Sequence, residues 1–323
     1  MYEMSVGQAI LSGMTGSRMQ RLAGVATAAE LVGAGMSRGQ LRRLVRRGAW
    51  VRLGHGVFAP AGLVGAAAGD AAGKDAVRVA AALALTGPGA VASHHSAALI
   101  HGMDILGLRA ADPVTLTRAP RSTSRRASRP GVHIHIAALP REDVITWRGL
   151  PVTSVARTVV DLARASSFPA GVVAADSALR TRRVSKAELD LCITHCAGWP
   201  GIQNARRVAA FADARAESVL ESISRVAFHD HGLPPPELQA WVGDADEVIG
   251  RADFLWGDFR TVGEADGAIK YADPARAIAQ LDRDARLREA GFEVVHFTWQ
   301  QITRAPGQVV ASINVAFRRG SAR

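Results

Sequence analysis

Three carboxylates come close together in a predicted hairpin in the last third of the chain. Residues 251–267 place aromatic and β-branched residues on both sides of a glycine-aspartate turn, and this pattern predicts two antiparallel strands. A hairpin centred on residues 258–259 brings Asp253 opposite Glu264, where two like charges destabilise a sheet. Asp266 lies on the same face as Glu264, because strand side chains alternate.

Crowded carboxylates of this kind need either a counter-ion or water. Hard oxygen ligands suit Mg²⁺, Mn²⁺ or Ca²⁺, so the hairpin predicts a divalent metal site. The alternative is an edge hairpin whose acids point into solvent. The spacing of the acids does not decide between these two interpretations.

Helices and strands on both sides of the hairpin must position these acids. Apolar residues at helical spacing predict one helix over residues 216–229, which carries Glu221, and another over residues 277–290, which carries Arg283. One strand is predicted before the hairpin and another over residues 292–299. The order helix, three strands, helix, strand indicates a mixed sheet flanked by helices.

Residues 216–303 resemble the very-short-patch-repair type of the PD-(D/E)xK superfamily of restriction-endonuclease-like proteins. Several spaced motifs match that family in the same order. They are Glu221-Ser-Ile-Ser-Arg225, Gly232-Leu-Pro-Pro-Pro-Glu-Leu-Gln239, Ala252-Asp-Phe-Leu-Trp256, Val262-Gly-Glu-Ala-Asp-Gly267 with Lys270, Arg283-Asp-Ala-Arg-Leu287 and Gly291-Phe-Glu-Val-Val-His-Phe-Thr-Trp299. The resemblance implies an endonuclease fold over this part of the chain.

The resemblance also implies a metal-dependent mechanism. Asp253 and Glu264 would hold Mg²⁺ or Mn²⁺, with Glu221 approaching from the first helix. The metal would activate a water molecule for attack on the scissile phosphate of DNA. Arg283 would contact a phosphate or order the acids.

The sequence departs from the family pattern at two positions. Ala252 stands where the superfamily often has proline, and Asp266 stands where it has a catalytic lysine. Asp266 and Lys270 complete the predicted catalytic set with the two metal-binding acids. Six residues of extended strand span about 20 Å, so Lys270 reaches the phosphate bound at Glu264 only if Gly267 bends the chain back.

The basic N-terminal segment has the signals of a winged helix. Thr27-Ala-Ala-Glu30 and Ser37-Arg-Gly-Gln40 both fit a capping box, so two short helices begin at these points. Residues 50–58 predict two short strands around a Gly-His-Gly turn, which form a wing. On the second helix, leucine and valine occupy one side and arginines occupy the opposite half.

This arginine face is typical of a helix that docks in the major groove of DNA. Arginine pairs bidentately with guanine or with phosphate. The predicted DNA-binding residues of this segment are Arg38, Arg42, Arg43, Arg46, Arg47 and Arg52. The alternative is a solvated face in an arginine-rich chain.

The same segment resembles the N-terminal winged-helix domain of the AbiEi-type antitoxin and transcriptional-regulator family. The matching residues are Ala34-Gly-Met-Ser-Arg-Gly-Gln-Leu-Arg-Arg-Leu44, Gly48-Ala-Trp-Val-Arg52 and Gly56-Val-Phe-Ala59. Residues 149–163 resemble the middle segment of these proteins. The resemblance implies binding to operator DNA, and it allows a cognate toxin and a homodimer as further assemblies.

The charge of the chain is unevenly distributed. The net charge is +10 in total, with +6 in residues 1–60 and −8 in residues 217–300. A basic front end joined to an acidic back end indicates two modules with different tasks. No leader resembles a signal peptide, and charges interrupt the most apolar tract, so the sequence predicts a cytoplasmic protein without a membrane span.

The cysteines and histidines of the middle segment favour structural roles over metal binding. Cys192 and Cys196 flank His195 on a predicted helix, and three ligands fall short of a structural zinc site. We expect reduced cysteines there. His94, His95 and His101 have no nearby acids in the sequence, which favours helix-cap or core histidines over a metal site.

Together these patterns predict an α/β multidomain protein. Its domains are a winged helix-turn-helix over residues 1–62, an α+β middle domain over residues 63–212 and a restriction-endonuclease-like mixed sheet flanked by helices over residues 213–323. The favoured function is a Mg²⁺-dependent endonuclease that acts on double-stranded DNA and is linked to toxin-antitoxin or phage-defence systems. The alternative is a non-enzymatic antitoxin and transcriptional repressor whose degenerate nuclease fold serves in dimerisation or DNA clamping. A repair nickase for mismatched DNA is a third hypothesis.

Overall fold

The chain forms two compact units, which are described separately below. The computed structural model describes residues 24–109, 112–120, 130–243, 248–267 and 274–322. Unit 1 contains Met1–Ser166 with Val184–Arg206, and unit 2 contains Ser167–Arg183 with Arg207–Arg323. The three-domain division with boundaries at residues 62 and 212 remains a prediction, because compactness does not measure which segments fold alone.

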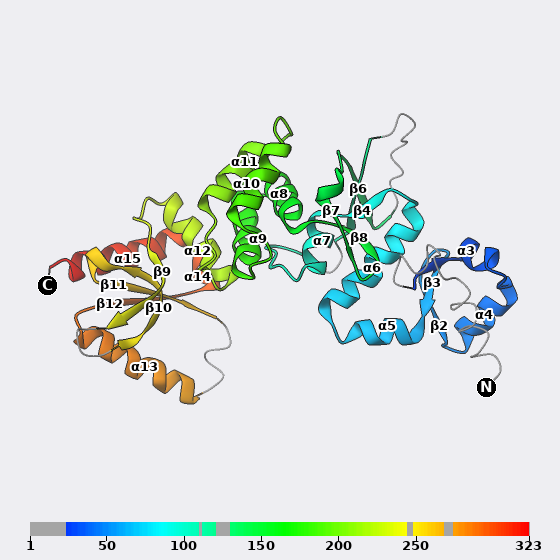
Figure 1. Cartoon of the computed structure of the whole chain (residues 1–323). Helices are drawn as coiled ribbons and strands as arrows, with labels where there is room; N and C mark the ends of the chain where they lie inside the picture. Colours follow the sequence, from blue (N-terminus) through cyan, green and yellow to red (C-terminus); the bar gives the residue numbers. More distant parts are fainter. Residues whose placement is uncertain (1–23, 110–111, 121–129, 244–247, 268–273, 323) are drawn as a thin grey trace. The chain divides into compact units, whose positions relative to one another are not determined.

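Unit 1 begins with the elements of a winged helix (Figure 1). They are β1 (Ala26–Thr27), α3 (Ala28–Gly33), α4 (Arg38–Arg46), β2 (Trp50–Gly54) and β3 (Val57–Pro60). Both predicted capping boxes are present, one at Thr27 and one at Ser37. The strands form an antiparallel sheet in the order β1-β3-β2. Leu31, Leu41 and Trp50 are buried in the core beneath the helices.

The rest of unit 1 is built on a five-stranded mixed sheet in the order β6-β5-β4-β8-β7. Its strands are β4 (Ala90–Ala92), β5 (Val114–Arg118), β6 (Val132–Ile136), β7 (Val144–Trp147) and β8 (Leu150–Thr153). The helices of this part are α5 (Ala61–Ala68), α6 (Ala71–Thr86), α7 (His94–Ile100), α8 (Val155–Ala165) and α10 (Lys186–His195). Val57 and Ala59 of the wing share one core with Leu83 and Leu116. The winged helix and the mixed sheet are therefore packed together within unit 1.

Unit 2 follows the predicted order of elements. Its elements are α9 (Phe168–Arg180), α12 (Val219–Asp230), β9 (Glu237–Gly243), β10 (Val248–Trp256), β11 (Thr261–Asp266), α13 (Pro274–Glu289), β12 (Glu293–Thr298), α14 (Trp299–Arg304) and α15 (Pro306–Gly320). Helix α11 (Ile202–Phe211) runs from residues of unit 1 into residues of unit 2. The helix that we expected from residue 216 begins at Val219, because the Ser218 side chain caps it by accepting a hydrogen bond from the Glu221 amide.

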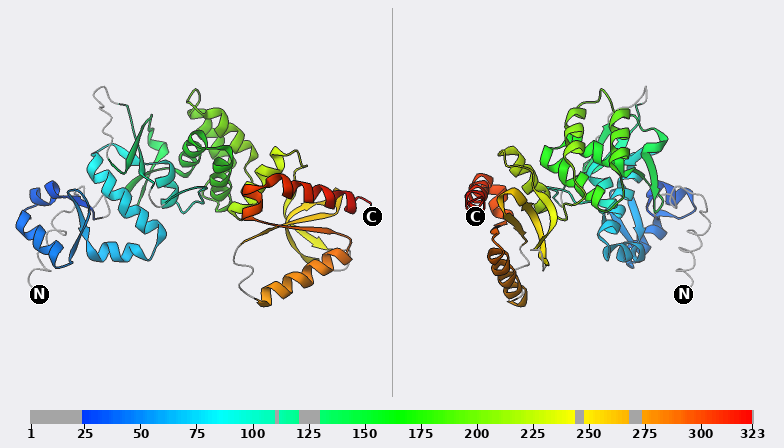
Figure 2. Two further views of the ribbon diagram at one scale, coloured as in Figure 1. Left: turned by 180° about the vertical axis from the view of Figure 1, so that it is seen from behind. Right: turned by 60° about the vertical axis from the view of Figure 1, so that its left-hand side comes forward.

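The sheet of unit 2 has the order β12-β11-β10-β9, with β11 and β12 parallel and the other pairs antiparallel. Helices α13 and α15 lie on opposite faces of this sheet (Figure 2). On the α15 face, Phe228, Phe254, Trp256 and Phe317 form an aromatic core with edge-to-face contacts. The α13 face carries the predicted acids.

The middle histidines lie within or beside the folded core of unit 1. His101 is buried with its Nε2 atom 2.8 Å from the Thr153 carbonyl oxygen, and the His94 and His135 rings stack at 3.8 Å. Burial lowers the pKa of His94 to about 2 and the pKa of His135 to about 4. Cys192 and Cys196 are free and buried, as expected.

Among the helices that the structure describes, none combines the length and apolar character that a bilayer-spanning segment requires.

Candidate functional site

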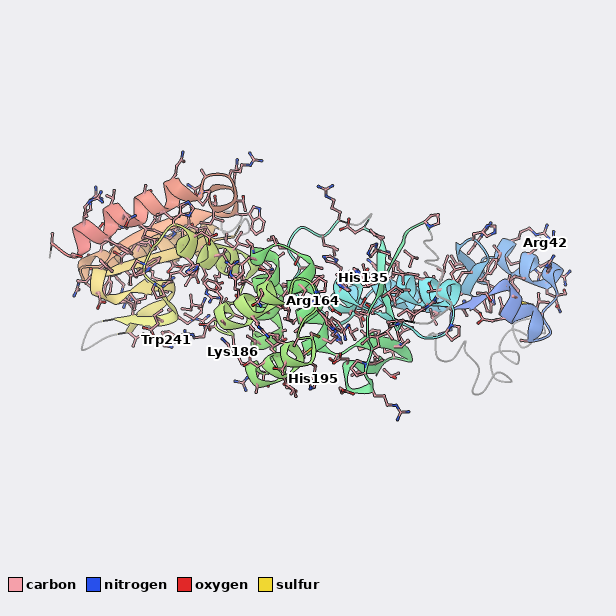
Figure 3. All side chains as sticks on the ribbon, turned by 90° about the horizontal axis from the view of Figure 1, so that it is seen from above. Arg42, His135, Arg164, Lys186, His195 and Trp241 are labelled. Atoms are coloured by element: carbon pink, nitrogen blue, oxygen red, sulfur yellow. The ribbon has the colours of Figure 1, made fainter. Side chains whose placement is uncertain are left out.

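Helix α4 presents the predicted arginines to solvent. Its apolar residue Leu41 is buried, whereas Arg38, Arg42, Arg43 and Arg46 are exposed. Figure 3 shows Arg42 extending from the surface of this helix. The capping box at Ser37 fixes the start of α4, with the Gln40 amide donating to Ser37 Oγ at 3.1 Å and the Ser37 amide donating to Gln40 Oε1 at 2.8 Å. The helix thus holds its arginines on one face by local hydrogen bonds and one apolar stripe.

The wing adds a further arginine beside α4. Arg52 on β2 is exposed, and its Nε donates to the Gly54 carbonyl oxygen at 3.1 Å. Its Nη2 atom lies 3.3 Å from His55 Nδ1 in the wing turn. The turn needs Gly56, whose φ of +72° is in the left-handed region. Arg52 therefore lies against the turn of the wing, where a basic side chain can reach a phosphate.

The winged helix carries a strong excess of positive charge. Residues 24–60 contain six arginines and one acid, Glu30, which gives a net charge of +5. The Glu30 carboxylate accepts hydrogen bonds from the backbone amide and the side chain of Thr27, at 2.7 and 2.8 Å, as part of the α3 cap. A face of this kind has the charge and the bidentate donors for a polyanion such as DNA.

The hairpin of unit 2 folds in the predicted register. Phe254 pairs with Gly263 and Trp256 with Thr261, and Asp253 and Glu264 come next along β10 and β11. In the parallel pairing on the other side, Glu264 is opposite His296. Gln239 lies next to Asp253 on β9 by the adjacent register. A polar row thus crosses all four strands of the sheet, and we call Gln239, Asp253, Glu264 and His296 the acid row.

Glu221 and Asp253 are joined by a glutamine that we did not expect from the sequence. Gln239 Nε2 donates to Glu221 Oε2 at 2.9 Å and to Asp253 Oδ1 at 3.2 Å. The Ala265 amide donates to Asp253 Oδ2 at 2.9 Å. Glu221 also accepts from the Glu217 amide and the Ser218 hydroxyl, both at 2.8 Å. Burial raises the pKa of Glu221 despite these donors.

Glu264 is buried against Arg283 of α13. The Arg283 Nη2 atom donates to Glu264 Oε1 at 2.6 Å and to the Arg251 carbonyl oxygen at 2.7 Å. Glu264 is 2% exposed, so this guanidinium is a nearby cation for a carboxylate that has little contact with water. Two roles were predicted for Arg283, contact with a phosphate or ordering of the acids, and the structure places it against the acids.

Asp266 lies beside a histidine that has no counterpart among the predicted site residues. His296 Nδ1 is 3.2 Å from Asp266 Oδ2, and His296 Nε2 is 2.8 Å from Asp284 Oδ2. The hydrogen bond with Asp266 raises the pKa of His296, and the one with Asp284 adds to this. The signals in the sequence are the inner position of His296 in a predicted strand and its place in the matched motif from Gly291 to Trp299. Lys270 lies outside the described residues.

Protein donors contact the predicted metal-binding acids in this arrangement. Glu221, Asp253 and Glu264 each accept hydrogen bonds from protein groups. Within the described ranges, no three His, Cys, Asp or Glu side chains come together in a way that could hold a metal ion.

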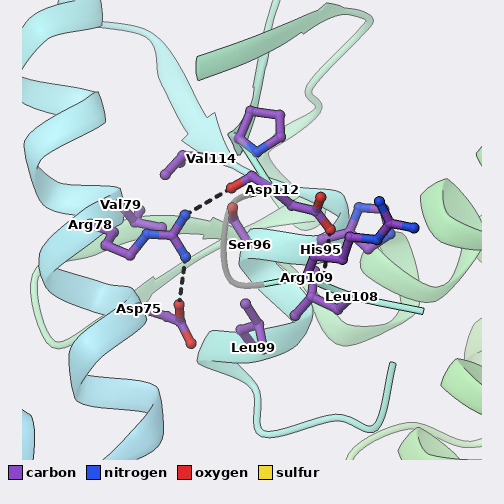
Figure 4. Close-up of a pocket in the computed structure, with 11 residues that line it drawn as sticks. Asp75, Arg78, Val79, His95, Ser96, Leu99, Leu108, Arg109, Asp112 and Val114 are labelled. Carbon is purple, nitrogen blue, oxygen red and sulfur yellow. Dashed lines mark hydrogen bonds and ion pairs between the residues drawn. The ribbon is translucent and has the colours of Figure 1, made fainter. Parts of the chain in front are cut away.

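A small cavity in unit 1 has no room for a ligand. It encloses about 10 Å³, which is enough for about one water molecule. Arg78 crosses its wall, with Nη1 3.4 Å from Asp75 Oδ1 and Nη2 donating to the Asp112 carbonyl oxygen at 2.8 Å (Figure 4). His95 and Ser96 also line it.

Two family models match this chain. Residues 17–61 match the model described as "Transcriptional regulator, AbiEi antitoxin", and residues 90–210 match the model described as "AbiEi antitoxin C-terminal domain". Two uncharacterized proteins of Mycobacterium tuberculosis, from strains CDC 1551 and H37Rv, are each 32% identical to it over 281 residues. The match covers 86% of this chain and 96% of each relative. The chain belongs to the AbiEi antitoxin family.

The family assignment bears differently on the two candidate sites. The first AbiEi model covers α3, α4 and the wing, where the arginine face lies. The second ends before α12, so the acid row lies beyond both models. These comparisons support the regulator that we kept as the alternative, and they give no support to the endonuclease that we favoured from the sequence.

Proposed function

We propose that this AbiEi family member is a DNA-binding transcriptional repressor of its own operon, and that it reads duplex DNA with α4 and the wing. The observation that carries the proposal is the exposed arginine face of α4. A recognition helix places such side chains at base edges and phosphates, with a neighbouring wing on the backbone. The family description supports this function independently of the charge.

The test is a binding titration with the promoter DNA upstream of the gene. Arg42→Ala combined with Arg46→Ala removes two charges from the face, and we expect about a 100-fold weaker Kd, because each lost arginine contact costs about tenfold. Fluorescence anisotropy with labelled DNA measures this. Arg318→Ala combined with Arg319→Ala is the matched control, because both arginines are exposed on α15. Equal affinities for the two double variants would contradict the assignment.

Cleavage is the competing function, and it is tested separately. Supercoiled plasmid is incubated with the full chain and Mg²⁺ or Mn²⁺. We expect no nicking. Nicking that disappears in Asp253→Ala and in Glu264→Ala would replace the repressor with the endonuclease of the original prediction.

We further propose that a cognate toxin is the protein partner, and that residues 90–210 provide its binding region. The support is the description of the matching model as an antitoxin domain. Coexpression with the product of the adjacent gene tests the partnership. We expect the adjacent product to arrest growth alone and not together with the full chain; arrest in both cases would contradict it.

A further inference from the structure

The acid row of unit 2 lies outside the proposed DNA-reading face, and its hydrogen bonds follow one pattern. A metal ion in a carboxylate cluster sits where the lone pairs of several oxygens converge. Here donors of the protein itself contact the carboxylate oxygens. Gln239 lies between Glu221 and Asp253, and Arg283 lies on Glu264.

Gln239 reaches its place through an unusual backbone conformation. Its φ is +54°, in the left-handed region, although it lies within β9. A non-glycine residue in this region is uncommon and costs about 1 kcal/mol or more. Such a conformation persists only when its surroundings hold it. In this strand the two hydrogen bonds to Glu221 and Asp253 accompany it.

The side chain of Arg283 packs closely against the backbone of β10. A Cβ atom on Gly250 would lie 2.9 Å from Arg283 Nε and 3.3 Å from its Cδ, so the guanidinium stem lies directly against the Gly250 backbone. Its Nη2 group is held between the Arg251 carbonyl oxygen and Glu264. Among the described residues, Arg283 Nε is a buried nitrogen without a hydrogen-bond partner. The packing of Arg283 thus leaves its Nε donor unsatisfied, while its Nη2 group stays paired with Glu264.

We infer that Arg283 is a built-in cation that takes the place of a divalent metal ion, so that the acid row is a metal-independent ion-pair network. The guanidinium supplies the positive charge that buried Glu264 requires. Gln239 supplies a neutral bridge between the other two acids. A metal could bind at Glu264 only after Arg283 left this carboxylate.

The experiment measures metal binding rather than activity. Thermal unfolding of the full chain is followed in millimolar Mn²⁺ and in EDTA. For the unchanged protein we expect melting temperatures that agree within about 1 °C. Arg283→Gln removes the internal cation, and we expect Mn²⁺ to raise its melting temperature by about 5 °C, as a ligand well above its Kd does. Adding Glu264→Gln to this variant should abolish the response.

Two further variants keep the test decisive. Gly250→Ala forces the Arg283 side chain to shift without removing its charge, because the added Cβ would lie 2.9 Å from Nε, and it replaces Arg283→Gln if that variant does not fold. Arg318→Gln, which removes an exposed arginine of α15, should show no Mn²⁺ response. A Mn²⁺ response of the unchanged protein that is lost in Asp253→Asn would overturn the inference. A folded Arg283→Gln protein that does not respond to Mn²⁺ would overturn it as well.

Discussion

The arginines of α4 and the carboxylates of unit 2 carry charge in opposite ways. Arg42 and Arg46 are exposed to solvent on one helix face. Glu221 and Glu264 are buried and accept hydrogen bonds from neighbouring protein groups. Charge that is left to solvent is available to a polyanion, whereas charge that is matched inside the fold mainly determines how that fold holds together.

The largest expected difference in unfolding free energy is between arginine-to-glutamine substitutions in the two regions. Arg283→Gln removes the guanidinium that pairs with buried Glu264 and should cost about 3–5 kcal/mol of unfolding free energy. Arg46→Gln changes an exposed side chain and should stay within about 0.5 kcal/mol. Chemical denaturation measures both. If the two variants lost similar stability, the contrast between charges paired inside the fold and charges exposed to solvent would be wrong.

The histidines of the mixed sheet in unit 1 and of the carboxylate cluster in unit 2 should give opposite pH dependences. His94 and His135 have lowered pKa values in the fold, about 2 and about 4. The unfolded chain binds more protons below about pH 6.5, so the stability that these groups provide above pH 6.5 is lost as the pH falls toward pH 4. Each group contributes up to about 1.4 kcal/mol per pH unit in this window.

His296 should act in the other direction, because its pKa is raised in the fold. Its contribution is fully present below about pH 6.5 and is lost as the pH rises through the raised value. Urea unfolding from about pH 4.5 to about pH 8.5, a range that brackets the ordinary histidine pKa, would measure the unfolding free energies of His135→Gln and His296→Gln. His135→Gln should weaken the loss of stability at low pH, and His296→Gln should weaken the loss of stability at high pH. The opposite assignment of these two effects would contradict the predicted environments.

The smallest effect concerns the salt dependence of DNA binding. Each lost phosphate contact lowers the slope of log K against log salt concentration by about 1. Arg42→Ala combined with Arg46→Ala should therefore flatten the slope by up to about 2, whereas Arg283→Gln should leave it unchanged. Titrations at several KCl concentrations measure the slope. A flatter slope in Arg283→Gln would mean that unit 2 also contacts the DNA backbone.

The features that were predicted correctly are those with fixed local spacing. The capping boxes at Thr27 and Ser37 depend on residues three apart. The hairpin register follows from its turn, and Phe254 pairs with Gly263 as the predicted register requires. Hydrogen bonds in short loops and helix ends allow few alternatives, so the sequence by itself determined these elements and the arginine face of α4.

The partners of the acids were decided by the tertiary structure alone. Gln239 is 14 residues from Asp253, Arg283 is 19 residues from Glu264, and His296 is 30 residues from Asp266. A row of acids in a sequence is compatible with a metal ion, with water or with donors from another element, because all three satisfy a carboxylate. Only the packing of β9, β12 and α13 around the hairpin brings Gln239, Arg283 and His296 to these acids.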